Sequence, residues 1–208
     1  MARRNDHTPA ELSDEVIQRV LDFLQTAPVS QLSLRKLAKM VGYSPGTLIN
    51  HFGSYAHLIL AANARTLDQI GELLLEAVKQ SQAPSTQLTL FAHRYWQFAQ
   101  DHPYQWQILF EHHLEPDDEV PTWQINRIDR LFKLIERCLR ELKPQVGEQD
   151  CQKASRTLWA SVHGICALSL DNKLFAASTL EAGSMIDSLL KHFLASWAQD
   201  ASPNGGLA

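Results

Sequence analysis

Side chains able to recognise a nucleic acid are concentrated in one short stretch of the chain, between residues 35 and 55. Arginine pairs well with guanine, the asparagine amide pairs with adenine, and hydroxyl groups donate hydrogen bonds to phosphates. Arg35, Asn50 and Thr47 supply these three kinds of group. The stretch is therefore a candidate surface for contact with DNA.

The charge of the chain indicates a local interaction with DNA. The net charge is -4, which argues against a protein that coats nucleic acid over its whole surface. No acidic residue occurs between Phe23 and Leu67, and the basic residues of that interval are Arg35, Lys36, Lys39 and Arg65. A basic face on an acidic body concentrates the attraction for a polyanion at one place.

Two short helices are predicted to position these side chains. Leu34, Leu37, Ala38 and Val41 have the spacing of one helix face, and Gly42 follows where a helix commonly ends in the left-handed region. The pair 44–45, Ser-Pro, is typical of a helix start, and the second helix then runs to residue 52. A helix, a turn of about four residues and a second helix form the geometry that enters a major groove.

The same residues resemble the helix-turn-helix of the TetR family of bacterial transcriptional regulators. The resemblance rests on the order and spacing of Arg35, Leu37, Ala38, Gly42, Ser44, Thr47, Leu48, Ile49, His51 and Phe52. Two positions depart from the family pattern, because Ile49 replaces a tyrosine and Tyr55 replaces a lysine. Both positions contact phosphates in the family, so the resemblance implies either a weaker hold on the backbone or a neutral hydroxyl donor at Tyr55.

The predicted DNA-binding residues combine both arguments. Asn50 is expected to face bases, with Thr47 or Ile49 against a thymine methyl, and Arg35 to face a base or a phosphate. The resemblance implies phosphate contacts for Thr47, His51 and Tyr55. The alternative is that His51 and Tyr55 pack between helices. The full predicted set is Arg35, Ser44, Pro45, Gly46, Thr47, Asn50, His51 and Tyr55.

The rest of the chain predicts helices throughout, since no segment alternates apolar and polar residues as a strand would. A first helix is expected from about residue 9 to Thr26, and a long helix after Ser54 to about Gln80. We therefore predict an all-α fold with two domains. Residues 1–53 would form a three-helix helix-turn-helix domain, residues 54–200 a larger helical domain for effector binding and dimerisation, and residues 201–208 a disordered tail.

A second resemblance lies in the C-terminal part. The segment 159–164, Trp-Ala-Ser-Val-His-Gly, resembles the Trp-x-x-x-His-Gly motif of a WHG-type TetR subgroup. TetR proteins enclose an effector pocket in this region, so the resemblance implies a small-molecule effector, and the aromatic residues of this segment indicate an apolar or aromatic one. The candidate lining residues are Trp96, Trp106, Phe110, Trp159 and His163. Aromatic residues at helical spacing are also typical of an ordinary core, and this alternative carries equal weight.

The last predicted helix carries a broad apolar stripe, and its apolar area is larger than one neighbouring helix would bury. Its members are Ile186, Leu189, Leu190, Phe193, Leu194 and Trp197. The stripe resembles the TetR dimer interface, where two helices of each subunit form a four-helix bundle. A homodimer also suits a palindromic operator, because one short helix contacts few base pairs.

Other classes of protein find little support in the sequence. No P-loop, dinucleotide-binding fingerprint or nucleophile elbow occurs, so we expect no enzyme activity and no cofactor. The adjacent His112 and His113 diverge on a helix, and no metal site is predicted. No apolar run could cross a membrane, no secretory signal is present, and three cysteines suit a reducing compartment, so a cytoplasmic protein is expected.

Taken together, the sequence predicts a dimeric repressor of transcription that binds double-stranded DNA and is released by an effector. Two alternatives stay open. In the first, a protein partner controls the same DNA-binding fold. In the second, a helical ligand-binding protein has lost DNA recognition, as the changes at Ile49 and Tyr55 could indicate.

Overall fold

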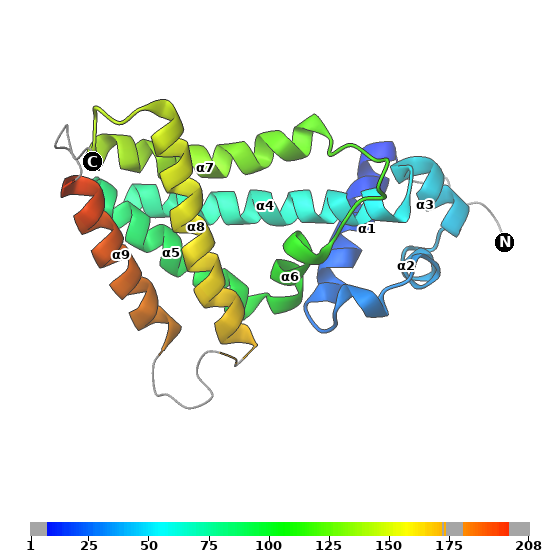
Figure 1. The fold of residues 1–208 in the computed structure, drawn as a ribbon. Coiled ribbons are helices and arrows are strands. Elements are labelled where there is room, and N and C mark those ends of the chain that lie inside the picture. The colour runs from blue at the N-terminus through cyan, green and yellow to red at the C-terminus, as the bar shows by residue number, and fades with distance from the viewer. Residues whose placement is uncertain (1–7, 172, 174–180, 200–208) are drawn as a thin grey trace. The chain divides into compact units, whose positions relative to one another are not determined.

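The structure is a computed structural model, which describes residues 8–171, 173 and 181–199. The described residues form helices and no strand, which confirms the predicted all-α fold (Figure 1). The helices are α1 (Pro9–Leu24), α2 (Leu34–Val41), α3 (Pro45–Phe52), α4 (Tyr55–Gln80), α5 (Pro84–Asp101), α6 (Pro103–Glu111), α7 (Thr122–Leu142), α8 (Glu148–Leu170) and α9 (Ala182–Gln199). The first helix ends at Leu24, two residues earlier than expected, because the chain then turns toward the short 3-10 helix η1 (Val29–Gln31).

The helices group into two compact units. Unit 1 contains Met1–Gln69 and Asp101–Arg127, and unit 2 contains Ile70–Gln100 and Ile128–Ala208. The predicted DNA-binding domain, residues 1–53, lies within unit 1, together with the first part of α4 and with α6. The predicted tail, residues 201–208, lies outside the described residues.

Local capping explains where the first three helices begin and end. Thr8 and Glu11 form a capping box at the start of α1, and Pro9 occupies the first helical position. Ser33 caps α2, and Ser44 caps α3 with Pro45 following it. Gly42 ends α2 with φ 75°, a conformation that costs glycine little and other residues more. These caps fix the turn between α2 and α3.

The core of unit 1 holds α2 and α3 against their supports. α1 packs against α2 and α6, and α2 packs against α3. The buried cluster shared by these helices and α4 is Leu12, Val16, Ile17, Val20, Leu21, Leu24, Leu32, Leu37, Ala38, Val41, Leu48, Leu58, Ile59, Ala62 and Ile108. Removing such apolar area from water stabilises the unit by about 25 cal/mol per Å². α3 contributes only Leu48 to the buried residues, so most of its surface stays available.

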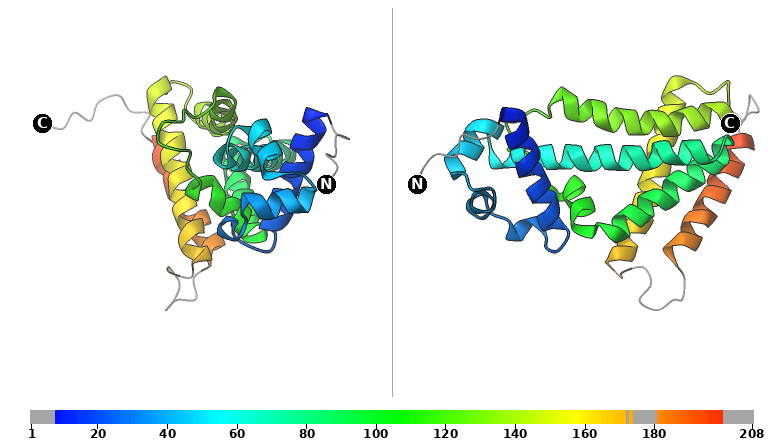
Figure 2. Two further views of the ribbon diagram at one scale, coloured as in Figure 1. Left: turned by 90° about the vertical axis from the view of Figure 1, so that its right-hand side faces the viewer. Right: turned by 180° about the vertical axis from the view of Figure 1, so that it is seen from behind.

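Unit 2 is built on α8 and α9, which pack against each other and are the yellow and orange-red helices of Figure 2. A nearly buried carboxylate also joins α7 to α8. The Glu136 side chain is 4% exposed, and Arg156 Nη1 lies 3.0 Å from its Oε1. Arg140 Nη2 lies 3.6 Å from Oε2 of the same carboxylate. A paired carboxylate of this kind tolerates loss of one partner poorly, so it fixes the register of the two helices.

No described helix is long and apolar enough to cross a membrane.

Candidate functional site

The start of α3 is held rigidly by its cap. Ser44 Oγ accepts a hydrogen bond from the Thr47 backbone N–H at 3.0 Å, and the two side-chain hydroxyls are 2.8 Å apart. The first turn of α3 therefore has one conformation in which its outward side chains are presented. Such preorganisation lowers the entropy lost when a surface binds a rigid partner.

Exposure divides the residues of α3 into two faces. Gly46 and Asn50 are exposed, whereas Leu48 is fully buried in the core of unit 1. Ser44 is also exposed, and Pro45, Thr47 and Ile49 are half-buried. The outward edge of α3 is thus small and polar, with space for close approach of another molecule at Gly46.

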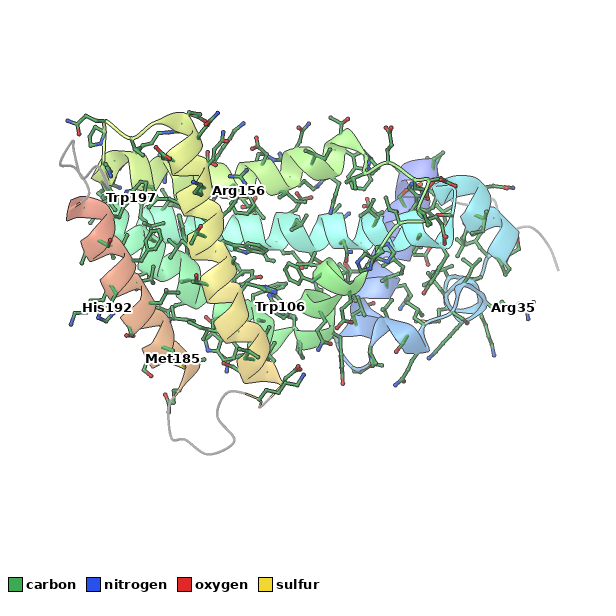
Figure 3. All side chains as sticks on the ribbon, in the orientation of Figure 1. Arg35, Trp106, Arg156, Met185, His192 and Trp197 are labelled. Carbon is green, nitrogen blue, oxygen red and sulfur yellow. The ribbon has the colours of Figure 1, made fainter. Side chains whose placement is uncertain are left out.

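Arg35 lies on α2 and its side chain projects outward from that helix (Figure 3). Lys39, one turn further along α2, is exposed as well. Among the described residues neither side chain makes an ion pair. Both charges therefore remain available to an external anion.

The two other basic residues of the acid-free interval are occupied within the protein. Arg65 Nη2 lies 2.6 Å from Asp14 Oδ1, so its charge is paired with a residue of α1. Lys36 Nζ lies 4.3 Å from the centre of the Phe23 ring and 3.3 Å from the carbonyl oxygen of Gln31. In the sequence, the interval contains four basic residues and no acidic one. In the folded protein, Asp14, which lies outside the interval, pairs with Arg65.

His51 and Tyr55 are directed toward the protein. His51 Nε2 lies 2.6 Å from Ser13 Oγ on α1, and its ring meets Phe52 edge to face at 4.7 Å. The Tyr55 hydroxyl donates a hydrogen bond to the carbonyl oxygen of Leu32, and burial raises the pKa of Tyr55 to about 12. These contacts favour the alternative in which both residues hold the helices together.

The predicted effector residues of unit 2 include two in direct contact. The rings of Trp159 and His163 stack at 5.3 Å on one face of α8, and Phe132 meets Trp159 edge to face at 5.7 Å. His163 Nδ1 lies 3.0 Å from the Tyr95 hydroxyl, and burial lowers the pKa of His163. Trp96 is half-buried on α5. The cluster therefore places the apolar rings of Phe132 and Trp159 next to the hydrogen-bonded pair of Tyr95 and His163.

The two predicted effector residues of unit 1 also contact each other. Trp106 is 3% exposed, and its ring lies 5.2 Å from that of Phe110. Phe110 is one of the exposed large apolar residues, at 37%. Trp106 is therefore a core residue of unit 1, whereas Phe110 has part of its ring available for other contacts.

Unit 1 also contains buried amides that the sequence analysis did not select. Asn63 Nδ2 donates to the Ile108 carbonyl oxygen at 3.0 Å, and Gln105 Nε2 donates to Thr66 Oγ1 at 3.0 Å. The oxygens Asn63 Oδ1 and Gln124 Oε1 are buried without a hydrogen-bond partner among the described residues. Buried acceptors of this kind normally bind water or a ligand donor. The sequence could have indicated these amides, because each is a polar residue on an otherwise apolar face of its helix.

The predicted dimer residues of α9 fall into two groups. Ile186 and Leu190 are 0% and 2% exposed, so they belong to the interior of the protomer. Leu189, Phe193, Leu194 and Trp197 are half-buried. Trp197 Nε1 donates a hydrogen bond to the Leu139 carbonyl oxygen at 3.1 Å. This part of α9 thus already has intramolecular neighbours.

The three cysteines are all buried with reduced thiols. Burial raises the pKa of each thiol, and that of Cys166 reaches about 12. A thiol with a raised pKa forms little thiolate and reacts slowly with oxidants. No group of three or more histidine, cysteine, aspartate or glutamate side chains suited to a metal ion occurs in the described part of the chain.

Comparison with protein families found one match. The profile of the tetracyclin repressor-like C-terminal domain matches residues 88–193. A search of curated proteins found no significant match.

Comparison with solved structures found the same fold in several bacterial proteins. A protein of unknown function from Rhodococcus sp. RHA1 aligns over 95% of this chain and 100% of its own, with 20% identity and a TM-score of 0.76. A TetR-family transcriptional regulator from Bordetella parapertussis 12822 aligns over 88% of this chain and 94% of its own, with 13% identity and a TM-score of 0.59. The transcriptional regulator FadR from Bacillus subtilis, in complex with stearoyl-CoA, aligns over 88% of this chain and 97% of its own, with 12% identity and a TM-score of 0.67.

Proposed function

Because the chain belongs to the TetR family of transcriptional regulators, we propose that it binds a palindromic operator as a homodimer and represses transcription until an effector releases it. The observation that carries this proposal is the division of the helix-turn-helix into an outward and an inward face. Arg35, Gly46 and Asn50 are exposed, while His51 and Tyr55 hold α3 and α4 to the rest of unit 1. A rigid polar edge beside uncompensated positive charge suits a major groove.

The roles of the exposed residues follow from their chemistry. Asn50 reads an adenine through its amide, and Arg35 contacts a guanine or a phosphate. Ser44, Pro45, Gly46 and Thr47 form the first turn of α3, which approaches the DNA backbone with its N–H groups and hydroxyls. Lys39 adds a phosphate contact that the sequence analysis did not include, because its charge is exposed and without an ion pair among the described residues.

The absence of the family's usual tyrosine and lysine does not remove this function. Tyr55 contributes by positioning rather than by touching phosphate, since its hydroxyl proton is engaged by Leu32. The same holds for His51, whose ring nitrogen meets Ser13. Phosphate binding in this chain therefore relies on Arg35, Lys39 and the first turn of α3.

The effector is proposed to be an apolar or aromatic molecule that contacts Trp96, Trp159 and His163 in unit 2. In unit 1, Phe110 beside the buried Trp106 is a separate candidate contact for a ligand. Support comes from the ring cluster around Trp159 and from the polar pair formed by Tyr95 and His163. The FadR structure contains stearoyl-CoA, so long-chain acyl thioesters belong in the panel of compounds to be tested. Within unit 1, Asn63 and Gln124 each offer a buried carbonyl oxygen to a water molecule or another donor.

The homodimer is proposed to form through the outer faces of α8 and α9. Leu168 on α8 is 41% exposed, and Leu189 and Leu194 on α9 are half-buried. Covering apolar side chains of this exposure with a second copy of the protein removes them from water, which stabilises the dimer. Ile186 and Leu190 support the interface from inside the protomer, since both are buried there.

Selection of bound sequences from a random pool of double-stranded DNA, at two salt concentrations, tests the proposal. We expect enrichment of a palindrome whose half-sites are separated by about one helical turn, and binding that weakens steeply with salt. The Asn50→Ala variant, which leaves the net charge unchanged, is expected to enrich a palindrome with weaker preference at one base pair of each half-site. Failure to enrich any sequence with the wild-type protein would contradict operator binding.

A further inference from the structure

One hydrogen bond connects Ser13 of α1 to the last turn of α3. Ser13 Oγ lies 2.6 Å from Nε2 of His51, a residue 38 positions further along the chain. We infer that Ser13 is a positioning residue for base recognition. Through His51 it fixes the rotation of α3 about its axis, and with it the direction of the Asn50 side chain. This inference rests on the proposed operator binding and adds to it a residue that contacts α3 instead of DNA.

The inward face of α3 has two different kinds of anchor. Leu48 is fully buried, and His51 follows three residues later, so both side chains lie on the same face of the helix. The apolar contact of Leu48 holds α3 against the core but is not directional. A hydrogen bond weakens steeply when its angle departs from the preferred one. The contact between Ser13 and His51 therefore sets the rotation at the end of α3, one helix length from its capped start at Ser44.

Ser13 itself belongs to a firmly anchored helix. Leu12 and Val16 of α1 are 8% and 0% exposed, so they hold α1 in the core of unit 1. Oδ1 of the adjacent Asp14 lies 2.6 Å from Nη2 of Arg65 on α4. Consecutive residues of α1 thus hold two different helices, α3 through Ser13 and α4 through Asp14. A hydroxyl group on such a helix can fix the orientation of α3.

Small rotations of α3 matter because of Asn50. Asn50 is exposed and precedes His51, so the two side chains leave the helix about 100° apart. The surface of a helix lies about 5 Å from its axis, so a rotation of about 10° displaces an outward side chain by about 1 Å. Binding groups need to be held within about 0.5 Å of their productive geometry. Loss of the Ser13 contact would therefore weaken base recognition, whereas Arg35 and Lys39 lie on α2 and would keep their phosphate contacts.

Affinities for two DNA duplexes test the inference on the full chain. One duplex is the palindrome selected by the wild-type protein, and the other has the same length and a shuffled sequence. Ser13→Ala is expected to lower the ratio of the two affinities by about tenfold, as loss of one aligned base contact would, and to leave the salt slope unchanged. Ser13→Thr keeps a hydroxyl group and is expected to keep the ratio. The matched control is Ser30→Ala, because Ser30 is exposed in η1 and its hydroxyl bonds to no described residue.

A double-mutant cycle tests whether Ser13 acts through His51. His51→Ala and the double variant Ser13→Ala/His51→Ala are expected to show the same loss of discrimination, because Ser13 matters only while His51 is present. Thermal unfolding of each variant confirms that it is folded at the temperature of the binding assay. A purely structural role of Ser13 would lower the thermal midpoint and leave the ratio of affinities unchanged.

The outcomes separate this inference from operator binding itself. Equal discrimination by the wild-type protein and Ser13→Ala overturns the positioning role alone, and so do losses that add in the double variant. The role is also overturned if His51→Ala weakens binding to both duplexes alike and reduces the salt slope, because His51 then contacts a phosphate. If the wild-type protein enriches no palindrome, operator binding fails first, and the positioning role fails with it.

Discussion

The hydroxyl of Tyr55 donates its hydrogen bond to the backbone carbonyl oxygen of Leu32. Tyr55 begins α4, and Leu32 precedes α2, so one side chain ties the loop before the helix-turn-helix to the helix after it. Leu32 is 3% exposed, which leaves its carbonyl without easy access to water. The residue that stands where TetR proteins usually carry a lysine thus has an intramolecular partner.

Replacement of Tyr55 by phenylalanine is expected to lower stability while leaving DNA binding almost unchanged. The Leu32 carbonyl oxygen would lose its donor, which costs about 1–2 kcal/mol in the free energy of unfolding. Urea denaturation measures this loss. Tyr104→Phe is the matched control, because the half-buried Tyr104 forms no hydroxyl hydrogen bond with any described residue. A large fall in affinity for all DNA sequences, with a smaller salt dependence, would instead show a phosphate contact at Tyr55.

Replacement of Asn50 by alanine is expected to reduce discrimination at one base pair of each half-site. Loss of an amide contact to adenine costs about 1–3 kcal/mol against the preferred base and little against the others. Competition binding with operator variants measures this difference. Lys39→Ala provides the contrast, since it should weaken binding to every sequence alike and reduce the salt slope by about one. Equal losses across sequences for Asn50→Ala would remove Asn50 from the base contacts.

The stability of the protein is expected to fall in mild acid partly through His163. Burial lowers its pKa below the ordinary value of 6.5, so the folded state prefers neutral histidine. Its contribution is complete above pH 6.5 and is lost progressively as the pH falls below that value, because only the unfolded state takes up the proton readily. His163→Gln is expected to flatten this part of the pH profile of unfolding.

The remaining acid sensitivity of that variant has another expected source. Burial also lowers the pKa of His112, whose Nε2 lies 2.9 Å from the Ala56 carbonyl oxygen. This contribution is the same in wild type and in His163→Gln, so it cancels in the difference between their profiles. Identical pH profiles of unfolding for the two proteins would show that the pKa of His163 is the same in the folded and unfolded states.

Replacement of Leu168 by aspartate is expected to dissociate the homodimer. The side chain is 41% exposed on α8, so its replacement costs the isolated protomer little, but a charge would be buried without a partner at the interface. Sedimentation velocity measures the change in mass. Leu75→Asp is the matched control, because Leu75 on α4 is 42% exposed. If the Leu168 variant stays dimeric, the interface lies elsewhere.

Local chemistry in the sequence determined the helices and the position of the helix-turn-helix. Ser33, Ser44, Pro45 and Gly42 set the ends of α2 and α3 through caps and a positive φ angle, which depend on neighbouring residues alone. The apolar spacing likewise predicted which face of α3 is buried, since Leu48 is enclosed and Asn50 is exposed. These features follow from the periodicity of a helix and need no distant contact.

Only the tertiary structure decided which polar and aromatic groups are already engaged. Asp14 pairs with Arg65, Leu32 accepts from Tyr55, and Leu139 accepts from Trp197. In each pair the partners are separated by many residues, and periodicity within one helix carries no information about such distances.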